Sequence, residues 1–295
     1  MARIPVLLNA SAGALKADRK IGGRVAEALA KAGIDAEVEL LEDGNCEVRC
    51  RAIAERGDPL IIVGGGDGTI SAAVTALVGA KTSLGILPLG TLNHFARDLK
   101  IPTGIEEAAE LIAKRPERQV DVAEMNGRIF INNSAIGLYP LLVVDRDAQR
   151  RTLGRSKAVA MVIASVRTLM RFGHQRLILT VNDREGQVDT PLLFVGNNDY
   201  RTDLGAAGHR DSIEQGKLCV YVMRKKTRLG FIAASARALL NRSRPDDMVQ
   251  IENVERLRVS SHRGQLAVSL DGEVVRAEAP VEYRIRKRAL RVIAP

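Results

Sequence analysis

The sequence predicts an α/β fold joined to a β fold: an N-terminal three-layer α/β domain with a mostly parallel sheet, then a C-terminal antiparallel β-sandwich. Short apolar runs alternate with amphipathic helical patterns in the first half, which is typical of parallel strands connected by helices. The second half carries shorter β-rich runs, which are typical of antiparallel sheets. With 295 residues, 46% of them apolar, the chain can bury two cores of ordinary size.

Four apolar runs in the first half are expected to be strands, and four helical patterns follow them. Strands connected by helices run parallel, so their carboxyl ends lie at one edge of the sheet, where ligands bind in open α/β folds. In chain order we expect strands at 4–8, 36–41, 60–63 and 84–87, and helices near 18–32, 45–56, 69–79 and 104–115.

Near residue 124 the sequence changes from alternating strand and helix patterns to shorter β-rich runs. We therefore predict an α/β domain over residues 1–124 and a β-sandwich over residues 125–287, with residues 288–295 returning to pack on the first domain. The strands of the second half are expected at 120–125, 128–134, 177–182, 191–196, 217–223, 256–260, 265–270, 274–278 and 281–286.

The composition excludes several protein classes. The three cysteines lack the spacing of a disulfide framework or a structural zinc site, and they fit a reducing compartment. Cys46 and Cys50 stand four residues apart on one face of a predicted helix, so we expect buried and unreactive thiols. The N-terminal apolar run is too short for a signal peptide, and no segment reaches the roughly 20 apolar residues that span a bilayer. We expect a cytoplasmic protein.

Positive charge is concentrated in the second half. Residues 1–123 contain 15 basic and 17 acidic side chains, whereas residues 124–295 contain 29 basic and 18 acidic ones. Two segments hold the excess: residues 146–176 with 8 basic and one acidic side chain, and residues 224–244 with 7 basic and none acidic. This asymmetry predicts an anionic partner for the second half.

Each basic segment contains an amphipathic helical pattern, at 158–172 and at 229–240. A basic amphipathic helix favours contact with an anionic membrane surface, so we expect peripheral association with the inner membrane surface. A helix that covers one side of the sandwich and exposes a solvated basic face is the alternative. Nucleic acid is not expected, because the chain has no Trp, only nine Phe and Tyr residues, and no recognisable nucleic-acid-binding module.

Three unusual loops follow three of the expected strands. They are NASAG at 9–13, GGGDGT at 64–69 and PLGTLNHFARDL at 88–99. Glycine lets backbone N–H groups approach a ligand, and a helix that starts directly after the loop offers unpaired donors and a favourable dipole, so GGGDGT predicts a phosphate-binding loop. A Walker loop is excluded because no Gly-Lys-Ser/Thr is present, and a dinucleotide fingerprint is excluded because Thr69 stands where a third glycine is required.

Asp67 is the unexpected residue of this loop. A carboxylate beside bound phosphates is repulsive unless it holds a metal ion or receives a proton, which favours Mg²⁺-dependent phosphoryl transfer with Asp67 near the Mg²⁺. The alternative is that Asp67 only caps the helix or stabilises a turn. In PLGTLNHF, Gly90 and Thr91 can donate hydrogen bonds and Asn93 can orient the loop, as a second wall of the same site.

GGGDGT, PLGTLN and a late DGE at 271–273, in this order, resemble the diacylglycerol kinase catalytic-domain family. The resemblance implies a two-domain lipid kinase with ATP and Mg²⁺ as cofactors and a lipid as substrate. It implies that Glu273 is the general base, in cooperation with Asp67. The ATP site implied by the motifs comprises Asn9, Gly64, Gly65, Gly66, Asp67, Gly68, Thr69, Gly90, Thr91 and Asn93.

By itself, Asp271-Gly272-Glu273 also reads as a tight hairpin turn, because Asp-Gly is the usual chemistry of such turns. Three positions depart from the family pattern. His94 stands where an Asp is usual, Leu40 stands where a nucleotide-contacting Thr is usual, and Gln215 replaces an Asp that binds a structural Mg²⁺. The structural Mg²⁺ site is therefore in doubt, and the departures indicate a distinct substrate or reduced activity.

The leading interpretation is an ATP-dependent kinase that transfers the γ-phosphate to the hydroxyl of diacylglycerol or a related lipid. Two alternatives stay open. An NAD kinase-like enzyme shares a GGDGT loop, although the Asn-Glu pair expected for the dinucleotide ribose is not evident. A non-catalytic nucleotide- or lipid-binding protein would keep the phosphate-binding loop and lose turnover, which the departures at positions 40, 94 and 215 motivate.

Overall fold

The computed structural model describes residues 3–9, 20–41, 45–138, 140, 173–200, 210, 212–225, 227–239 and 246–295. Contacts divide the chain into two compact units. Unit 1 comprises residues 1–122, 212–215 and 286–295, and unit 2 comprises residues 123–211 and 216–285. The helix expected at 158–172 lies outside the described residues.

Unit 1 is built on a parallel sheet with the order β2-β1-β3-β4. The last part of β16 (Val281–Ile293) adds to this sheet, with Val292 parallel to Leu84. The strands β3 and β4 are buried along their whole length, which explains why their sequences are continuous apolar runs rather than alternating ones. The bounds are β1 Ile4–Asn9, β2 Ala36–Leu41, β3 Leu60–Gly65 and β4 Ser83–Pro88.

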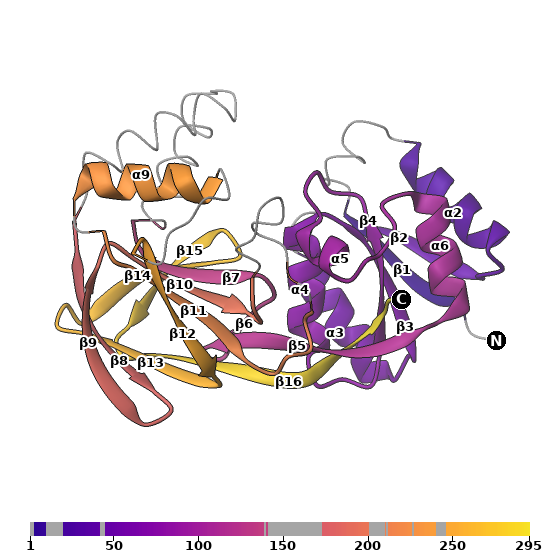
Figure 1. Cartoon of the computed structure of the whole chain (residues 1–295). Helices are drawn as coiled ribbons and strands as arrows, with labels where there is room; N and C mark the ends of the chain where they lie inside the picture. Colours follow the sequence, from indigo (N-terminus) through magenta and orange to yellow (C-terminus); the bar gives the residue numbers. More distant parts are fainter. Residues whose placement is uncertain are drawn as a thin grey trace. The chain divides into compact units, whose positions relative to one another are not determined.

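Helices cover both faces of this sheet and give unit 1 its three layers. The helices α2 and α6 contact each other on one face, and α3 and α4 contact each other on the other, as Figure 1 shows. Each long helix buries an apolar stripe, such as Val25 and Leu29 in α2, and exposes its polar side. The bounds are α2 Ile21–Lys31, α3 Cys46–Arg56, α4 Asp67–Leu77, α5 His94–Asp98 and α6 Ile105–Lys114.

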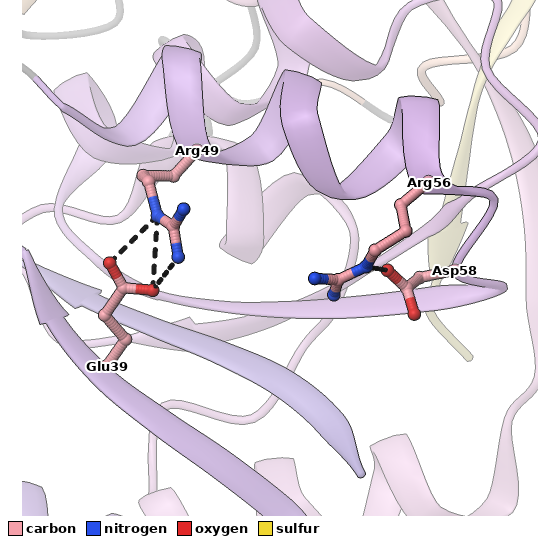
Figure 2. Close-up of polar contacts among 4 residues, drawn as sticks. All are labelled: Glu39, Arg49, Arg56 and Asp58. Carbon is pink, nitrogen blue, oxygen red and sulfur yellow. Dashed lines mark hydrogen bonds and ion pairs between the residues drawn. The ribbon is translucent and has the colours of Figure 1, made fainter. Parts of the chain in front are cut away.

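Two ion pairs join α3 to its surroundings (Figure 2). The Arg49 guanidinium donates to both carboxylate oxygens of Glu39 in β2, with Nε to Oε1 at 2.9 Å and Nη2 to Oε2 at 2.5 Å. At the other end of the helix, Arg56 Nε donates to Asp58 Oδ2 at 2.7 Å, just before β3. Pairs this exposed contribute at most about 1 kcal/mol each, so the apolar stripe stabilises α3 more than they do.

Unit 2 contains two packed antiparallel layers. One sheet has the order β12-β11-β10-β7-β14-β15, and the other layer joins β16 to β13, β8 and β9, with β5 and β6 off this path. The bounds are β5 Glu117–Met125, β6 Arg128–Phe130, β7 Asn133–Gly137, β8 Gln175–Val181, β9 Arg184–Thr190, β10 Leu192–Asn197, β11 Leu218–Met223, β12 Met248–Val254, β13 Arg256–Ser261, β14 Gln265–Leu270 and β15 Glu273–Glu278.

The predicted fold class is confirmed, but the strand expected at 128–134 is two strands, β6 and β7, and the sequence did not reveal two others. The strands β9 and β12 stand at the ends of their sheets, where much of each strand stays exposed. An exposed edge strand needs no regular apolar alternation, so REGQVDT and MVQIENV carry little strand signal. The short helix α5 was not predicted either, because five residues give no periodicity to detect.

One hydrophobic cluster of unit 2 contains two aromatic rings that meet edge to face. Phe130 and Tyr283 are both buried, with their ring centroids 6.2 Å apart. The hydroxyls of Tyr283 and Ser134 lie 3.0 Å apart and share a hydrogen bond, which satisfies the buried phenol.

One described helix belongs to unit 2. This helix, α9 (Arg228–Leu239), follows β11 in the chain and falls where the sequence predicts a helix at 229–240. Among the described residues, no helix is both long and apolar enough to cross a membrane.

Candidate phosphate-binding site

Three strand ends bring Asn9 and two of the predicted loops together in unit 1, whereas residues 10–13 of the first loop lie outside the described residues. The register pairs Leu8 with Gly64 and Gly65 with Pro88, so the carboxyl ends of β1, β3 and β4 are adjacent. The side chain of Asn9, the last residue of β1, reaches the loop after β3, where its Nδ2 donates to Thr69 Oγ1 at 2.8 Å. Of the predicted site residues, all except Glu273 are therefore gathered at one edge of one sheet.

The helix α4 begins in the middle of GGGDGT. Gly66 is the N-cap residue with an extended backbone, and the first helical hydrogen bond runs from Ile70 N to Gly66 O at 3.0 Å. No side chain caps this helix. The N–H groups of its first turn therefore keep their donor capacity for a ligand, and the helix dipole adds partial positive charge at the same place.

Asp67 is the first residue of α4 and is half-buried. It makes no side-chain capping bond to its own helix. Gly66 rather than Asp67 is the N-cap residue, but a carboxylate in the first turn stabilises the helix dipole, so both the structural role and the role towards a ligand stay open.

Close packing explains three of the glycines. A Cβ at Gly64 would lie 2.5 Å from Leu8 Cδ2, and one at Gly65 would lie 2.6 Å from the Thr69 side chain. A Cβ at Gly90 would lie 2.5 Å from Gly66 Cα, so the two loops touch backbone to backbone. These positions require glycine for the fold alone.

Gly68 differs from the other glycines of the loop. It lies in the first turn of α4, it is exposed, and a Cβ added there would meet no atom of the described residues within 4 Å. Its backbone is helical, and glycine inside a helix costs about 0.5–1 kcal/mol relative to alanine. Neither packing nor backbone conformation therefore requires glycine at position 68.

Asn93 fixes the shape of the loop after β4. Its Oδ1 accepts from Gly90 N at 2.9 Å, and its Nδ2 donates to Gly90 O at 2.9 Å and to Pro88 O at 3.3 Å. The residue is buried and has a left-handed backbone with φ of 50°, which asparagine tolerates better than most residues. Thr91 is exposed beside it, with its hydroxyl accessible to a ligand.

The DGE segment belongs to unit 2, where it forms the predicted two-residue turn. Leu270 pairs with Glu273, and Asp271 and Gly272 between them have φ of 46° and 87°. The Asp271 carboxylate also accepts three backbone hydrogen bonds, from Ile131 N at 2.9 Å, Asn132 N at 2.8 Å and Asn133 N at 3.1 Å. This clamp fixes the turn that carries Glu273, whose own side chain is exposed.

The sequence analysis did not predict the side-chain hydrogen bonds that also hold the segment bound by Asp271. Arg210 is buried and donates to Ile131 O at 2.7 Å and to Asn197 O at 3.0 Å. The amide of Asn197 donates to Ile131 O as well, at 3.0 Å. The segment after β6 is thus held through its N–H groups by Asp271 and through the Ile131 carbonyl by Arg210 and Asn197. The only sequence signal was VGNN at 195–198, which says nothing about partners so distant in the chain.

Asp67 belongs to unit 1 and Glu273 to unit 2, so their cooperation stays a prediction. Leu40 in β2 is exposed, as are His94 at the start of α5 and Gln215 in the segment 212–215. No group of three or more His, Cys, Asp or Glu side chains that could hold a metal occurs in the described part of the chain.

The residues around Asp67 nevertheless fit Mg²⁺ bound together with a nucleotide. Mg²⁺ in phosphoryl-transfer sites is held by one or two carboxylates, substrate phosphates and water, rather than by an all-protein cage. A single half-buried carboxylate beside unpaired helix donors and close glycine backbones meets that requirement.

Two family models match this chain. The "Diacylglycerol kinase catalytic domain" matches residues 3–125, and the "YegS C-terminal NAD kinase beta sandwich-like domain" matches residues 142–294. A "Probable lipid kinase YegS-like" from Chromohalobacter salexigens is 29% identical over 274 residues, which cover 91% of this chain and 86% of the relative. A "Diacylglycerol kinase" from Bacillus subtilis is 26% identical over 256 residues, which cover 85% and 83%.

Solved structures show the same fold. A crystal structure of a diacylglycerol kinase from Bacillus anthracis str. Sterne has a TM-score of 0.71 at 20% identity and covers 99% of this chain and 97% of its own. Yeast NADH kinase in complex with NADH has a TM-score of 0.56 at 10% identity, covering 100% of this chain and 84% of its own. With both domains matched in order, the chain belongs to the diacylglycerol kinase catalytic-domain family of lipid kinases, with a YegS-type C-terminal domain.

Proposed function

We propose that this protein is an ATP-dependent lipid kinase that transfers the γ-phosphate to the hydroxyl of diacylglycerol or a related lipid at a membrane surface. Membership in the family supports a kinase. The names of the relatives from Chromohalobacter salexigens and Bacillus subtilis favour a lipid acceptor.

The open surroundings of Gly68 are the observation that supports nucleotide binding in this proposal. Its helical backbone and the open space around its Cα leave the fold without a need for glycine. A phosphate that packs against the first turn of α4 would need that space, because the donors of the turn must come within about 3 Å of phosphate oxygens. The glycine is then explained by a ligand rather than by packing.

In the proposed reaction, the lipid hydroxyl oxygen attacks the γ-phosphorus, the bond from that phosphorus to the bridging oxygen breaks, and ADP leaves. The Glu273 carboxylate accepts the proton of the hydroxyl, and its exposure at a rigid turn leaves it accessible to a substrate. The first-turn N–H groups of α4 orient the phosphates, and Asn9 holds Thr69 in place from the neighbouring strand. Mg²⁺, held by Asp67 and the phosphates, would neutralise the negative charge that builds up during transfer.

The test is phosphate transfer from radiolabelled Mg-ATP to a lipid extract in mixed detergent micelles, with the labelled lipid identified by mass spectrometry. We expect a labelled monophosphorylated lipid, and a fall in kcat of at least 100-fold for Asp67→Asn and for Glu273→Gln. Glu278→Gln, at the far end of the same strand and also exposed, is the matched control and should keep full activity. Absence of any labelled lipid would overturn the proposal.

A second pair of variants tests the role of Gly68. Gly68→Ala and Gly23→Ala each add a methyl group to a helix at a place where no atom lies within 4 Å. Both variants should fold at least as stably as the wild type. Only Gly68→Ala should raise the KM for ATP, by tenfold or more, and an unchanged KM would remove the argument for the phosphate position.

An NAD kinase-like activity is the second candidate, because the C-terminal family model is described as NAD kinase-like and yeast NADH kinase shares the fold. Offering NAD and diacylglycerol as competing acceptors separates the two enzymes. A non-catalytic protein would bind ATP in calorimetry without transferring phosphate to either acceptor.

A further inference from the structure

We propose that the first two turns of α9 insert into an anionic lipid bilayer, with Leu229 and Ile232 as the inserted side chains. Leu229 is 79% exposed and Ile232 is 42% exposed, and both are among the few large apolar side chains that the described surface leaves in water. The residues are three positions apart in the helix, so they lie on one face, where the exposed Ala233 continues the apolar surface.

Contacts along α9 hold the helix in unit 2. Ala234 is buried, and the Arg237 guanidinium binds the Asp247 carboxylate through two contacts, one of them from Nε to Oδ2 at 2.8 Å. Asp247 is only 2% exposed, and Lys225 Nζ lies 3.5 Å from its Oδ1. The helix is therefore anchored with a fixed face towards solvent, rather than free to turn its leucine inward.

The start of α9 is also fixed. Thr227 Oγ1 accepts a hydrogen bond from Gly230 N at 3.1 Å, and Phe231 N donates to Thr227 O at 2.9 Å. A threonine that binds the N–H three residues later is a helix cap. Leu229 thus sits in a capped first turn, and its exposure is a property of a formed helix.

The positive charge of the segment that contains α9 favours an anionic bilayer as the partner. The segment 224–244 contains seven basic side chains and no acidic one, and two of them, Arg224 before α9 and Arg228 at its first position, are exposed. Lys225 and Arg237 contact the buried Asp247. Apolar side chains between basic ones match the boundary between acyl chains and anionic headgroups. The proposal relies on the lipid kinase function only for the expectation that the protein meets a membrane.

The first experiment uses the absence of tryptophan from the chain. Leu229→Trp places a single fluorophore on α9, and Val48→Trp places one at a comparably exposed site in α3, where Val48 is 68% exposed. With vesicles of equal parts phosphatidylglycerol and phosphatidylcholine, we expect a blue-shifted emission for Leu229→Trp only. No shift for Leu229→Trp, or an equal shift at both sites, would overturn the proposal.

The second experiment measures vesicle cosedimentation of the full chain. Leu229→Ser with Ile232→Ser should weaken binding at least tenfold on both anionic and pure phosphatidylcholine vesicles, whereas Val48→Ser should bind as the wild type does. Arg224→Gln with Arg228→Gln should weaken binding to anionic vesicles only. A Leu229/Ile232 variant that binds vesicles with wild-type affinity would contradict insertion. A variant that keeps vesicle binding but loses self-association in light scattering would also contradict it, because the apolar face would then bind a second copy of the chain.

A failure of membrane insertion can be distinguished from a failure of the proposed lipid kinase activity. In detergent micelles, where lipid is supplied without a bilayer, the Leu229/Ile232 variant should keep the wild-type rate of phosphate transfer. Failure of transfer by every variant in micelles would count against the lipid kinase activity and not against insertion. A loss of micelle activity confined to the Leu229/Ile232 variant would instead place α9 in substrate handling and overturn the proposal.

Discussion

At the scale of single residues, the two aspartates of the family motifs have different surroundings. Asp67 is half-buried at an uncapped helix start, where it makes no capping bond. Asp271 accepts three backbone hydrogen bonds from a segment about 140 positions away in the sequence. Asp271 thus organises the turn on which Glu273 stands, whereas a role of Asp67 towards a ligand stays a prediction.

This difference predicts the effect of Asp271→Asn. An asparagine side chain keeps only one oxygen and turns an NH₂ group towards backbone N–H donors, so we expect unit 2 to lose about 2–3 kcal/mol of unfolding free energy. Asp183→Asn is the matched control. Asp183 also lies in a two-residue hairpin turn with positive φ, between β8 and β9, but it is exposed, so its replacement should change stability little.

Urea unfolding followed by circular dichroism measures both variants. Equal unfolding free energies for the two would show that the three hydrogen bonds to Asp271 contribute nothing beyond the turn itself.

At the scale of elements, the candidate site depends on two loops that approach each other through glycine backbones. The Cβ of Gly90→Ala would lie 2.5 Å from Gly66 Cα and 2.6 Å from Asn93 Oδ1. Backbone cannot give way as a flexible side chain can, so the loops must separate. We expect a loss of roughly 2–3 kcal/mol, at the upper end of the range for overpacking.

Thermal unfolding of Gly90→Ala should show a lower Tm than the wild type by several degrees, whereas Gly23→Ala, which meets no atom within 4 Å, should show an equal or higher Tm. Equal Tm values for Gly90→Ala and the wild type would mean that the loops tolerate a wider spacing than their contact indicates.

At the scale of the whole molecule, both units bury groups that keep their protons in the folded state. A hydrogen bond to Cys46 and burial both raise the pKa of the Cys50 thiol in unit 1, and burial raises the pKa of the Cys219 thiol in unit 2. Burial also raises the pKa of the Tyr283 phenol, although its hydrogen bond with Ser134 opposes this. The expectation that Cys46 and Cys50 are buried is confirmed.

These shifts predict how stability depends on pH. The unfolded chain releases these protons above the ordinary pKa values of 9.0 for the thiols and 10.0 for the phenol, whereas the folded chain retains them. The contribution is therefore fully present below pH 9 and is lost as the pH rises further. The opposite shift of Cys46, whose pKa is lowered by the hydrogen bond from Cys50, offsets part of this loss.

The measurement is the urea unfolding free energy between pH 8 and pH 10.5. We expect a decline that begins near pH 9, and a shallower decline above pH 10 for Tyr283→Phe, which has no phenol to titrate. The same slope for Tyr283→Phe and the wild type would show that Tyr283 does not contribute.

The sequence was sufficient for features whose causes are local. Strands buried on both faces must be apolar throughout, so β3 and β4 were evident as runs, and the longer helices of unit 1 were evident from their apolar stripes. The turn at Asp271-Gly272 was predictable because positive φ at both residues favours this dipeptide. The glycine loops at the strand ends indicated a phosphate-binding edge, since parallel topology alone brings those ends together.

Only the tertiary structure decided which of these residues belong to the fold and which are left for a ligand. Gly64, Gly65, Gly68 and Gly90 look alike in the sequence, yet three are required by close packing and one is not. The clamp of Asp271 on Ile131–Asn133, the support from Arg210 and the exposed Leu229 of α9 all depend on partners or surfaces far away along the chain. Contacts between residues far apart in the chain are set by the packing of sheets and helices, so a local sequence pattern does not predict them.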